Sequence, residues 1–370
     1  MRSVLVTGGA GFIGGNFVHY WAREHAADRI VVLDALTYAG NLSTLGTLLQ
    51  DQRIVFAQGD ITDRALVDSL LQRYEIDTIV HFAAESHVDR SIVDPGAFVR
   101  TNVVGTQILL DAATTAWRKE RVWNAGVRFH HVSTDEVYGS LTPSCAPFTE
   151  VTPYSPNSPY AASKAGSDHL VRAYSHTYGL PSSISNCSNN YGPFQFPEKL
   201  IPLMIVNALQ GKQLPVYGDG EQVRDWLFVE DHCVAIDRML QAPVAGQTFN
   251  VGGRAEHTNL EIVHGVCALI DEQFATRTDL RELFPDSPAA RGASVRSLIA
   301  HVTDRPGHDR RYAIDPAKIS TELGFEPSES LTTGLARTVD WYLANHAWWI
   351  AVQDGSYRQW IDQQYGALGR

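Results

Sequence analysis

Short apolar runs alternate with longer amphipathic stretches through the first half of the chain. The runs lie at residues 4–6, 30–33, 54–56, 78–82 and 128–132. Apolar runs of this length are typical of buried strands, and the stretches between them have the length and spacing of helices. Strands separated by helices predict an α/β fold with a doubly wound parallel sheet, in which crossover helices cover both faces.

A long helical pattern at residues 159–178 ends at Gly179, which suits the left-handed conformation that often follows a helix. A sixth strand is expected after this glycine. Beyond Asn189 the alternation gives way to segments punctuated by proline and glycine, with helical patterns again at 316–323 and 331–345. A smaller, mixed α/β unit is therefore expected in the C-terminal half.

The chain length and this change of pattern predict two domains. The first covers residues 1–188, and residues 225–255 are expected to return to it. The second covers residues 189–224 and 256–370.

The composition is that of an ordinary globular protein. The 370 residues are 44% hydrophobic and 19% charged, which argues against disordered, collagen-like and coiled-coil chains. The net charge of −11 argues against a broad basic surface for nucleic acid, so an anionic ligand requires cations placed locally. No stretch reaches about 18 uninterrupted apolar residues and no export signal is evident, so we expect a cytoplasmic protein that does not bind membranes.

The cysteines are widely spaced and form no C-x-x-C pair. They are Cys145, Cys187, Cys233 and Cys267. This spacing predicts neither a zinc knuckle nor a disulfide framework, and buried free thiols in a reducing compartment are the simpler interpretation. In such a compartment Asn186-Cys187-Ser188 is not a glycosylation site.

A glycine-rich turn follows the first strand. Residues 7–14 read Thr-Gly-Gly-Ala-Gly-Phe-Ile-Gly and match both G-x-x-G-x-x-G, from Gly8, and G-x-G-x-x-G, from Gly9. Such a turn lets the backbone approach a pyrophosphate and aims the N–H groups of a helix N-terminus at the anion. Asp34 ends the second strand, where a carboxylate accepts hydrogen bonds from ribose hydroxyls and repels a 2′-phosphate. The pattern predicts a Rossmann-type domain that binds NAD rather than NADP, although a plain turn with Asp34 as a strand-end cap is the alternative.

Further cofactor contacts are expected where the other strands end, because ligands of an open parallel sheet lie at the carboxyl ends of its strands. The predicted cofactor-binding residues are Gly8, Gly11, Phe12, Ile13, Gly14, Asp34, Ala35, Leu36, Thr37, Asp60, Ile61, Phe82, Ala83, Ala84, Ser86, Thr101, Tyr160, Lys164 and Asn189.

Tyr160 and Lys164 lie four residues apart at the start of the helix at 159–178, and so on one face of it. An ammonium beside a phenol stabilises the phenolate, so we expect Lys164 to lower the pKa of Tyr160 and make it a general base for a hydroxyl. Taken alone, the pair also fits a packed tyrosine beside a solvated lysine. The glycine-rich turn upstream favours the chemical interpretation.

These features, with Ser133 and Thr134 after the fifth strand, resemble the extended short-chain dehydrogenase/reductase superfamily, whose members bind NAD(P) and mostly act on nucleotide sugars. Further segments resemble the branch that dehydrates dTDP-glucose, namely 133–139, 186–193, 197–202, 224–226 and 304–312. The resemblance implies bound NAD, dTDP-glucose as substrate and a second domain that binds this nucleotide sugar. It also implies a homodimer in which helices near 98–117 and 159–178 pack together.

Asp135 and Glu136 distinguish a dehydratase from an epimerase of the same superfamily. A dehydratase must break a C5–H and a C6–O bond, which takes an extra base and an acid. Neighbouring carboxyls hold different protonation states because each charge raises the other's pKa. The resemblance assigns Glu136 to the C5 proton and Asp135 to the departing C6 hydroxyl, with Tyr160, Lys164 and Thr134 at the C4 hydroxyl. Outside this context, an Asp-Glu pair is an ordinary solvated pair.

The resemblance also locates the substrate. The predicted substrate-binding residues are Ser86, Thr134, Asn189, Glu198, Lys199, Leu200, Pro215, Val216, Tyr217, Arg224, Asn259, Arg305 and His308. Arg224 and Arg305 are expected at or near the diphosphate, because a guanidinium binds phosphate in bidentate fashion. Residues 215–217 are expected to line the thymine pocket.

Arg310 and Arg311 fit equally well as substrate contacts and as ordinary ion pairs. His308 has no second ligand at metal spacing, so we predict no metal site.

Two other functions remain open from the sequence. One is a 4-epimerase or a dehydratase of another nucleotide sugar, and the other is a non-catalytic regulator that binds NAD. The nucleotide base, the pathway and the roles of the segments at 140–156 and 285–295 are left undecided, and the latter segment is expected to be a surface loop.

Overall fold

The computed structural model of the chain describes residues 1–304 and 308–353. Its largest sheet contains β1 (Ser3–Thr7), β2 (Arg29–Asp34), β3 (Val55–Gln58), β4 (Thr78–His81), β7 (Arg128–Thr134), β8 (Ser182–Cys187) and β12 (Gln247–Val251). These seven strands pair in parallel in the order β12-β8-β7-β4-β1-β2-β3. The predicted Rossmann-type sheet is confirmed, and the expected sixth strand is β8. Sequence reasoning named no strand at β12.

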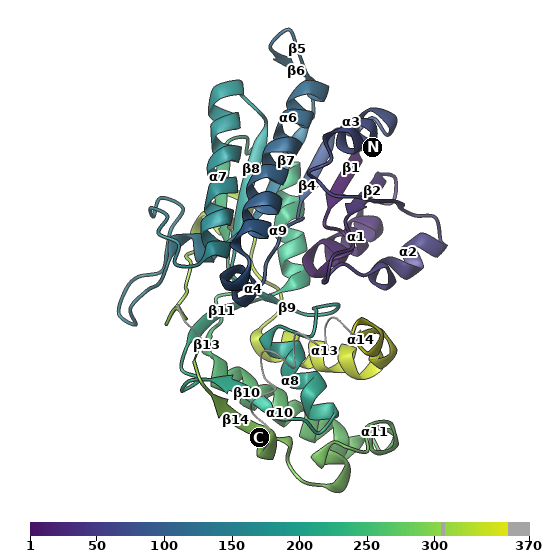
Figure 1. The fold of residues 1–370 in the computed structure, drawn as a ribbon, viewed down its shortest axis with the longest axis vertical. Helices are drawn as coiled ribbons and strands as arrows, with labels where there is room; N and C mark the ends of the chain where they lie inside the picture. The colour runs from purple at the N-terminus through teal and green to yellow at the C-terminus, as the bar shows by residue number, and fades with distance from the viewer. Residues whose placement is uncertain (305–307, 354–370) are drawn as a thin grey trace.

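Helices cover both faces of this sheet (Figure 1). They are α1 (Phe12–Glu24), α3 (Arg64–Arg73), α6 (Thr106–Trp117), α7 (Pro159–Tyr178) and α9 (Val229–Gln241). Val4 and Val6 of β1 lie in a buried cluster with α1 and α9, whereas Leu5 lies in a second cluster with α3, α6 and α7. Because the strands are covered on both sides, they are continuously apolar.

Short elements connect the strands and helices around the carboxyl edge of the sheet. They are η1 (Leu42–Leu45), α2 (Gly46–Gln50), α4 (Val88–Val93), α5 (Pro95–Phe98), η2 (Val99–Gly105) and η3 (Asp135–Tyr138). A two-stranded hairpin of β5 (Arg118–Lys119) and β6 (Val122–Trp123) projects from the far end of α6 (Figure 1).

The helical pattern at 98–117 is not one α-helix, because η2 is a π-helix that separates α5 from α6. The side-chain oxygen of Asn102 in η2 accepts a hydrogen bond from the Glu85 N–H at 2.9 Å, and its nitrogen donates to the Glu85 carbonyl at 3.0 Å. The π-helix thereby holds the segment that follows β4.

A smaller unit lies below the sheet in Figure 1. Its strands are β9 (Asn189–Tyr191), β11 (Val223–Phe228) and β13 (Glu256–Thr258) in one sheet, and β10 (Leu214–Tyr217) with β14 (Ile299–Val302) in another. Its helices are α8 (Leu200–Leu209), α10 (Asn259–Thr276), α11 (Asp279–Leu283), α13 (Leu331–Ala344) and α14 (His346–Val352). These elements, α11 included, share one large apolar core. The predicted mixed α/β character is confirmed.

The helical patterns predicted at 316–323 and 331–345 are confirmed as α12 (Ala317–Leu323) and α13. The expectation of a plain surface loop at 285–295 is wrong. This stretch contains η4 (Pro288–Arg291), leads into η5 (Val295–Leu298), and buries Val295 completely. The Val295 N–H donates to Asp271 of α10 at 3.0 Å, so this stretch is part of the core of the smaller unit.

The segment at 140–156 lies along the chain after residue 308. The N–H groups of Leu141 and Phe148 donate to the carbonyls of Arg311 and Ala313 at 3.0 and 2.9 Å. This connection ties the segment after η3 to the smaller unit.

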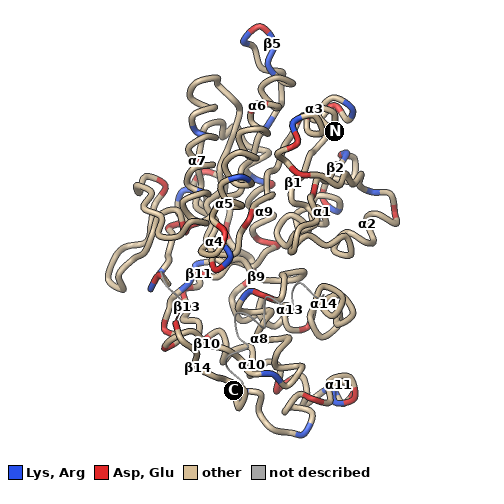
Figure 2. The backbone as a smooth tube through the Cα atoms, in the orientation of Figure 1, with Lys and Arg blue, Asp and Glu red and all other residues tan. Residues whose placement is uncertain are grey.

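All four cysteines have free thiols. Three are buried as expected, but Cys145 is exposed, because it lies at a turn of the 140–156 segment. Within residues 1–304 and 308–353, no helix has both the length and the apolar character needed to cross a membrane. Basic and acidic residues are interspersed along the described backbone (Figure 2).

Candidate active site

A cavity opens at the carboxyl ends of the parallel strands and reaches the start of the smaller unit. Of the predicted cofactor residues, all but Leu36 line it. Leu36 instead packs against the cluster that contains α1, and its backbone has a φ of 53°. The cavity is also lined by residues that the sequence analysis did not assign to cofactor or substrate, namely Ala39, Gly40, Gly59, Glu85, Val132, Ser133, Cys187, Ser188, Asn190, Gln195 and Phe196. Some of these are neighbours of predicted residues, which is the only signal that the sequence offers for them.

The glycine-rich turn approaches the backbone of β4 and the start of α1. A Cβ on Gly14 would lie 2.3 Å from the Gly8 carbonyl oxygen, and a Cβ on Gly8 would lie 2.6 Å from the Ala83 nitrogen. Gly8 also has a φ of 70°, in the left-handed region that favours glycine. No acidic residue lies in the first turn of α1. The N-terminus of α1 is therefore suited to bind an anion.

The Asp34 carboxylate connects β2 to this turn. Its Oδ2 accepts a hydrogen bond from the Ala10 N–H at 2.9 Å, and its Oδ1 accepts one from the Leu36 N–H at 2.8 Å. A carboxylate has room for further donors on each oxygen. Burial raises the pKa of Asp34, and the two backbone N–H groups oppose this shift.

Tyr160 and Lys164 project from the first turns of α7. Pro159 begins this helix, and the Ser158 hydroxyl caps it by accepting a hydrogen bond from the Ala161 N–H at 3.1 Å. Both side chains are buried, and the Lys164 ammonium donates to the Val132 carbonyl at 2.9 Å. The structure brings both residues into the cavity.

Tyr160 does not have the lowered pKa that the sequence analysis expected. Burial raises the pKa of Tyr160 well above its usual value, and the charge of Glu136 raises it further, while a hydrogen bond with Thr134 opposes the rise. Burial also lowers the pKa of Lys164 to about 8. Burial is therefore the largest cause of the pKa shift of each group.

Asp135 and Glu136 open η3, directly after β7. The Thr134 hydroxyl caps this turn by accepting a hydrogen bond from the Glu136 N–H at 3.2 Å, and it donates to Asp135 Oδ1 at 3.4 Å. Asp135 is 1% exposed, whereas Glu136 is only partly buried, and both line the cavity. Burial raises the pKa of Asp135 well above its usual value, and the charges of Glu136 and Asp225 add to the shift. Of the two carboxyls, the buried Asp135 is therefore the better suited to hold a proton.

Five of the predicted substrate residues line the same cavity, namely Ser86, Thr134, Asn189, Glu198 and Lys199. The Lys199 ammonium donates to the Ser86 carbonyl at 3.0 Å. Burial raises the pKa of Glu198 to about 7, although Lys199 and Arg90 oppose the shift.

The other predicted substrate residues that the structure describes do not line this cavity. Leu200 begins α8, Asn259 begins α10, and Pro215 and Val216 are buried in β10 with Tyr217 following them. His308 pairs with Asp304 at 2.6 Å, and Arg305 lies outside the described residues.

Arg224 is buried below the Tyr312 ring, with its guanidinium carbon 4.3 Å from the ring centroid. It donates to the Asp309 carbonyl at 2.9 Å. Arg310 and Arg311 form ion pairs with Asp219 and Glu256 at 3.0 and 2.7 Å, which is the ion-pair alternative of the sequence analysis. In the described part of the chain, no cluster of side chains is suited to hold a metal ion.

A Tyr-x-x-x-Lys helix at the carboxyl edge of a parallel seven-stranded sheet, opposite a glycine-rich turn, defines an extended short-chain dehydrogenase/reductase. The family model described as GDP-mannose 4,6 dehydratase matches residues 5–338. The chain is 56% identical to the dTDP-glucose 4,6-dehydratase of Xanthomonas campestris pv. campestris, over 97% of this chain and 98% of that protein. It is 53% identical to the enzyme of the same name from Neisseria meningitidis serogroup B, with the same coverage.

Among solved structures, the dTDP-glucose 4,6-dehydratase DesIV from Streptomyces venezuelae, determined with NAD bound, superimposes with a TM-score of 0.83. Its sequence is 46% identical, and the match covers 95% of this chain and 100% of that chain. The chain therefore belongs to the dTDP-glucose 4,6-dehydratase family.

Proposed function

We propose that the chain is a hydro-lyase that dehydrates dTDP-glucose to dTDP-4-keto-6-deoxy-glucose with NAD that is regenerated in each turnover. The observation that carries this proposal is the pair of Asp135 and Glu136 beside Tyr160. An epimerase has no need of an acid and a second base, and a non-catalytic regulator has no need of any of the three. The relatives named as this enzyme match nearly the full chain.

The residues of the cavity fit NAD. At Gly8 and Gly14, any side chain would collide with backbone, so the turn stays thin where a pyrophosphate approaches the N-terminus of α1. Asp34 is placed to accept hydrogen bonds from an adenosine ribose, and its charge disfavours a 2′-phosphate. When bound, NAD⁺ takes the hydride from C4 of the sugar and gives it back at C6.

In the oxidation step, Tyr160 takes the proton of the C4 hydroxyl. The ammonium of Lys164 and the hydroxyl of Thr134 stabilise the phenolate that this step requires. The resulting C4 ketone acidifies the proton on C5, which prepares the elimination.

In the elimination step, Glu136 removes the C5 proton and Asp135 protonates the departing C6 hydroxyl, so that water leaves. The partly exposed Glu136 is suited to act as the base, and the buried Asp135 is suited to hold the proton. Glu136 then returns its proton to C5 as hydride reaches C6.

For the rest of the substrate we retain the assignments made from the sequence. Residues 1–188 and 225–255 hold the cofactor, and residues 189–224 and 256–370 hold the nucleotide sugar. The position of β12 in the large sheet supports the first assignment. Lys199, Arg224 and Arg305 are proposed near the diphosphate.

A homodimer and a cytoplasmic location also belong to the proposal. Four exposed aliphatic side chains on and beside η2 support a dimer, namely Ile92, Val93, Val99 and Val104. Free thiols at every cysteine support a reducing compartment. Replacing Val99 and Val104 with glutamate is expected to give monomers, as measured by light scattering.

The experiment that tests the function incubates the purified protein with dTDP-glucose and no added NAD, and follows the sugar nucleotide by mass spectrometry. We expect the original protein to remove one water from dTDP-glucose and the Tyr160→Phe variant to remove none. UDP-glucose and GDP-mannose are assayed in parallel. A product of unchanged mass but altered sugar configuration would support the epimerase, water loss from GDP-mannose alone would support a different dehydratase, and unchanged substrate after NAD is added would support the regulator.

A further inference from the structure

Lys164 is a charged group in the interior of the protein. Its side chain is 4% exposed, and its carboxylate neighbour one turn along α7, Asp168, is fully buried. A buried ammonium is stable only when an opposite charge and hydrogen bonds compensate it. The mechanism proposed above uses Lys164 but leaves Asp168 without a role.

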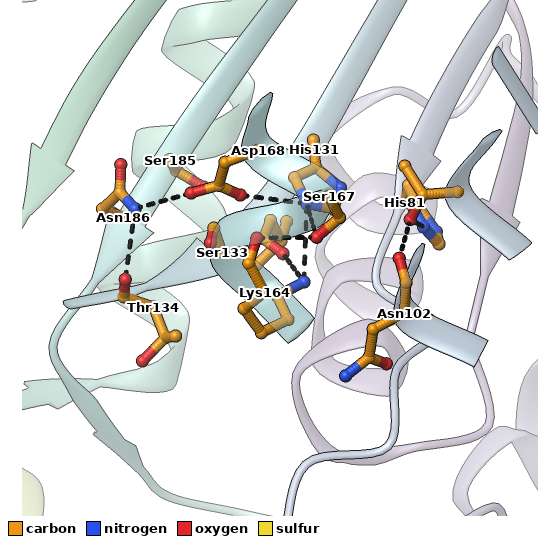
Figure 3. A network of polar contacts seen from close by, with 12 residues as sticks. His81, Asn102, His131, Ser133, Thr134, Lys164, Ser167, Asp168, Ser185 and Asn186 are labelled. Carbon is orange, nitrogen blue, oxygen red and sulfur yellow. Dashed lines mark hydrogen bonds and ion pairs between the residues drawn. The ribbon is translucent and has the colours of Figure 1, made fainter. Parts of the chain in front are cut away.

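The imidazole of His131, on β7, lies between these two charges (Figure 3). Its Nε2 is 3.2 Å from Asp168 Oδ1 and 3.5 Å from the Lys164 Nζ. Ser167 lies beside the same nitrogen at 3.2 Å and donates its own proton to the Lys164 carbonyl. The imidazole of His131 on β7 therefore lies next to both the Lys164 ammonium and the Asp168 carboxylate of α7.

The neighbours of His131 determine which of its nitrogens carries the proton. Burial and the adjacent Lys164 charge lower the pKa of His131 to about 4, so the ring is neutral. Nδ1 of His131 has no hydrogen-bond partner among the described residues. A proton on Nε2 is donated to the Ser167 oxygen and lies toward the Asp168 carboxylate, whereas a proton on Nδ1 leaves a buried N–H unpaired and a lone pair facing Asp168. We therefore assign the proton to Nε2.

Asp168 is held as a carboxylate from its other side. Its Oδ2 accepts hydrogen bonds from the Tyr154 hydroxyl at 2.8 Å and from the Asn186 amide at 3.2 Å. The Asn186 amide also donates to the Thr134 carbonyl at 3.1 Å, which ties this carboxylate to the turn that carries Asp135. Despite its burial, the pKa of Asp168 is lowered, with His131 as the largest opposing cause.

From this arrangement we infer that Asp168 is the counter-ion that keeps Lys164 protonated and fixed beside Tyr160 during turnover, by direct charge attraction past the His131 ring that both groups contact. Asp168 is then a positioning residue for the reaction, since it touches neither the substrate nor the cofactor. The inference rests on the proposed function where it concerns turnover, but the charge pairing itself does not depend on it.

The other groups around Lys164 do not supply the opposite charge. His81 of β4 lies with its ring 5.1 Å from that of His131, and burial keeps it neutral. Cys187 of β8 has its pKa raised to about 12 by burial, so it is a thiol. Tyr160 of α7 is a phenol by the same reasoning.

Two carboxyls on η3 are also near. Burial raises the pKa of Asp135 well above its usual value and so disfavours its charge, Glu136 is only partly buried and lines the cavity, and Asp168 is the carboxylate that raises the pKa of Lys164. Asp168 therefore remains as the counter-ion.

The first test is the pH dependence of kcat for the Asp168→Asn variant. Removing the carboxylate charge lowers the pKa of Lys164, so the alkaline limb of kcat is expected to move down by about one pH unit. The ratio of kcat at pH 8 to kcat at pH 6.5 should then be about fivefold lower for the variant than for the original protein. An alkaline limb at the original position would overturn the inference.

The His130→Gln variant is the matched control. His130 is the neighbour of His131 on β7, is fully buried, and contacts Ser183 and Ser185 on the opposite side of the strand. Substitution of His130 perturbs the same strand without touching Lys164, so the alkaline limb of kcat should not move in the His130→Gln variant. An equal shift in both variants would point to a general loosening of the site and contradict the inference.

The closing experiment measures stability and needs no activity. Lys164→Met and Asp168→Asn each leave one buried charge uncompensated, whereas the double variant removes both. We expect the double variant to unfold at a higher denaturant concentration than the less stable single variant, with a clearly non-additive cycle. The inference would be overturned by losses of stability that are additive, or by a double variant that unfolds at no higher a denaturant concentration than the less stable single variant. An original protein that is inactive on dTDP-glucose would overturn the proposed function and leave this cycle intact.

Discussion

Asp135 and Glu136 are consecutive in the chain, and the charge of Glu136 raises the pKa of the buried Asp135 carboxyl. The direction of η3 places one side chain inside the protein and leaves the other partly exposed to the cavity. Two chemically similar groups thereby lie in different environments, of which the buried one favours the protonated form. This difference is what an elimination requires, because one group must take a proton while the other gives one.

The Asp135→Asn, Glu136→Gln double variant should separate oxidation from elimination. Tyr160, Lys164 and Thr134 remain, so dTDP-glucose should still reduce bound NAD⁺ in a single turnover, as followed by nicotinamide absorbance. Little dehydrated sugar should form, as followed by mass spectrometry. Full product formation by this variant would remove both residues from the proposed elimination. Tyr160→Phe serves as the control, because it should block both steps.

Asp34 should contribute to NAD binding both directly and by holding the glycine-rich turn. Asp34→Ala removes the acceptors for the Ala10 and Leu36 N–H groups, and hydrogen bonds to a charged group are worth about 1.5–3 kcal/mol. We expect NAD affinity to fall roughly 10- to 100-fold, as measured by calorimetry on cofactor-free protein.

Asp63→Ala is the control for this measurement. Asp63 caps α3 by accepting a hydrogen bond from the Leu66 N–H at 3.0 Å, and it does not line the cavity. Its loss should lower stability without changing NAD affinity. NAD affinity within twofold of the original in Asp34→Ala would argue against the assigned role.

Gly15 directly follows the glycine-rich turn of residues 7–14 and lies in the first turns of α1. A Cβ at this position would lie 2.6 Å from Thr44 Cγ2, on η1. Gly15→Ala should therefore lower the free energy of unfolding by about 1–3 kcal/mol, as expected for overpacking. Adding Thr44→Ser, which removes the colliding methyl group, should restore most of the loss in urea unfolding.

Gly46→Ala is the control for this pair, because nothing lies within 4 Å of a Cβ at that position. Its stability should change little. A Gly15→Ala variant as stable as Gly46→Ala would show that η1 moves aside at no cost.

Local patterns were sufficient to predict the sheet, the glycine-rich turn and the reactive helix. The apolar runs that became β1, β2 and β4 are buried on both faces, so their sequence reflects their environment directly. The Tyr160 and Lys164 pair was predictable because its spacing is fixed by the helix that carries it. The carboxyl edge of the sheet then brought Asp34, Thr134 and the glycine turn together.

What the sequence could not predict depends on contacts between distant segments. The role of Gly15 depends on Thr44, and the burial of Val295 depends on α10. The predicted direction of the Tyr160 pKa shift was wrong, because helical spacing places Lys164 nearby but does not reveal that both groups are buried. Desolvation is a property of the folded interior, which no short motif contains.

The network at His131 is another example. His131 and Asp168 lie far apart in the chain, and both resemble ordinary members of a strand and a helix. Only the packing of α7 on β7 brings them within 3.2 Å of each other.

His130 allows the cost of such a buried imidazole to be measured. Burial lowers its pKa to about 3, whereas an unfolded chain has a histidine pKa near ~6.5. Above pH ~6.5 the imidazole is neutral in both states, so it adds no pH dependence. Below that pH the unfolded state binds a proton that the folded state does not, and the free energy of unfolding falls as the pH falls.

His130→Gln removes this proton linkage. The variant should be less stable than the original protein at pH 8, because it loses the hydrogen bonds to Ser183 and Ser185. Between pH 8 and pH 5 the difference should shrink by about 2 kcal/mol, since only the original protein carries the linkage. Urea unfolding at both pH values measures this change. The exposed His176, replaced in the same way, should give a difference that is equal at the two pH values, and a constant difference for His130→Gln as well would mean that His130 binds a proton inside the folded protein.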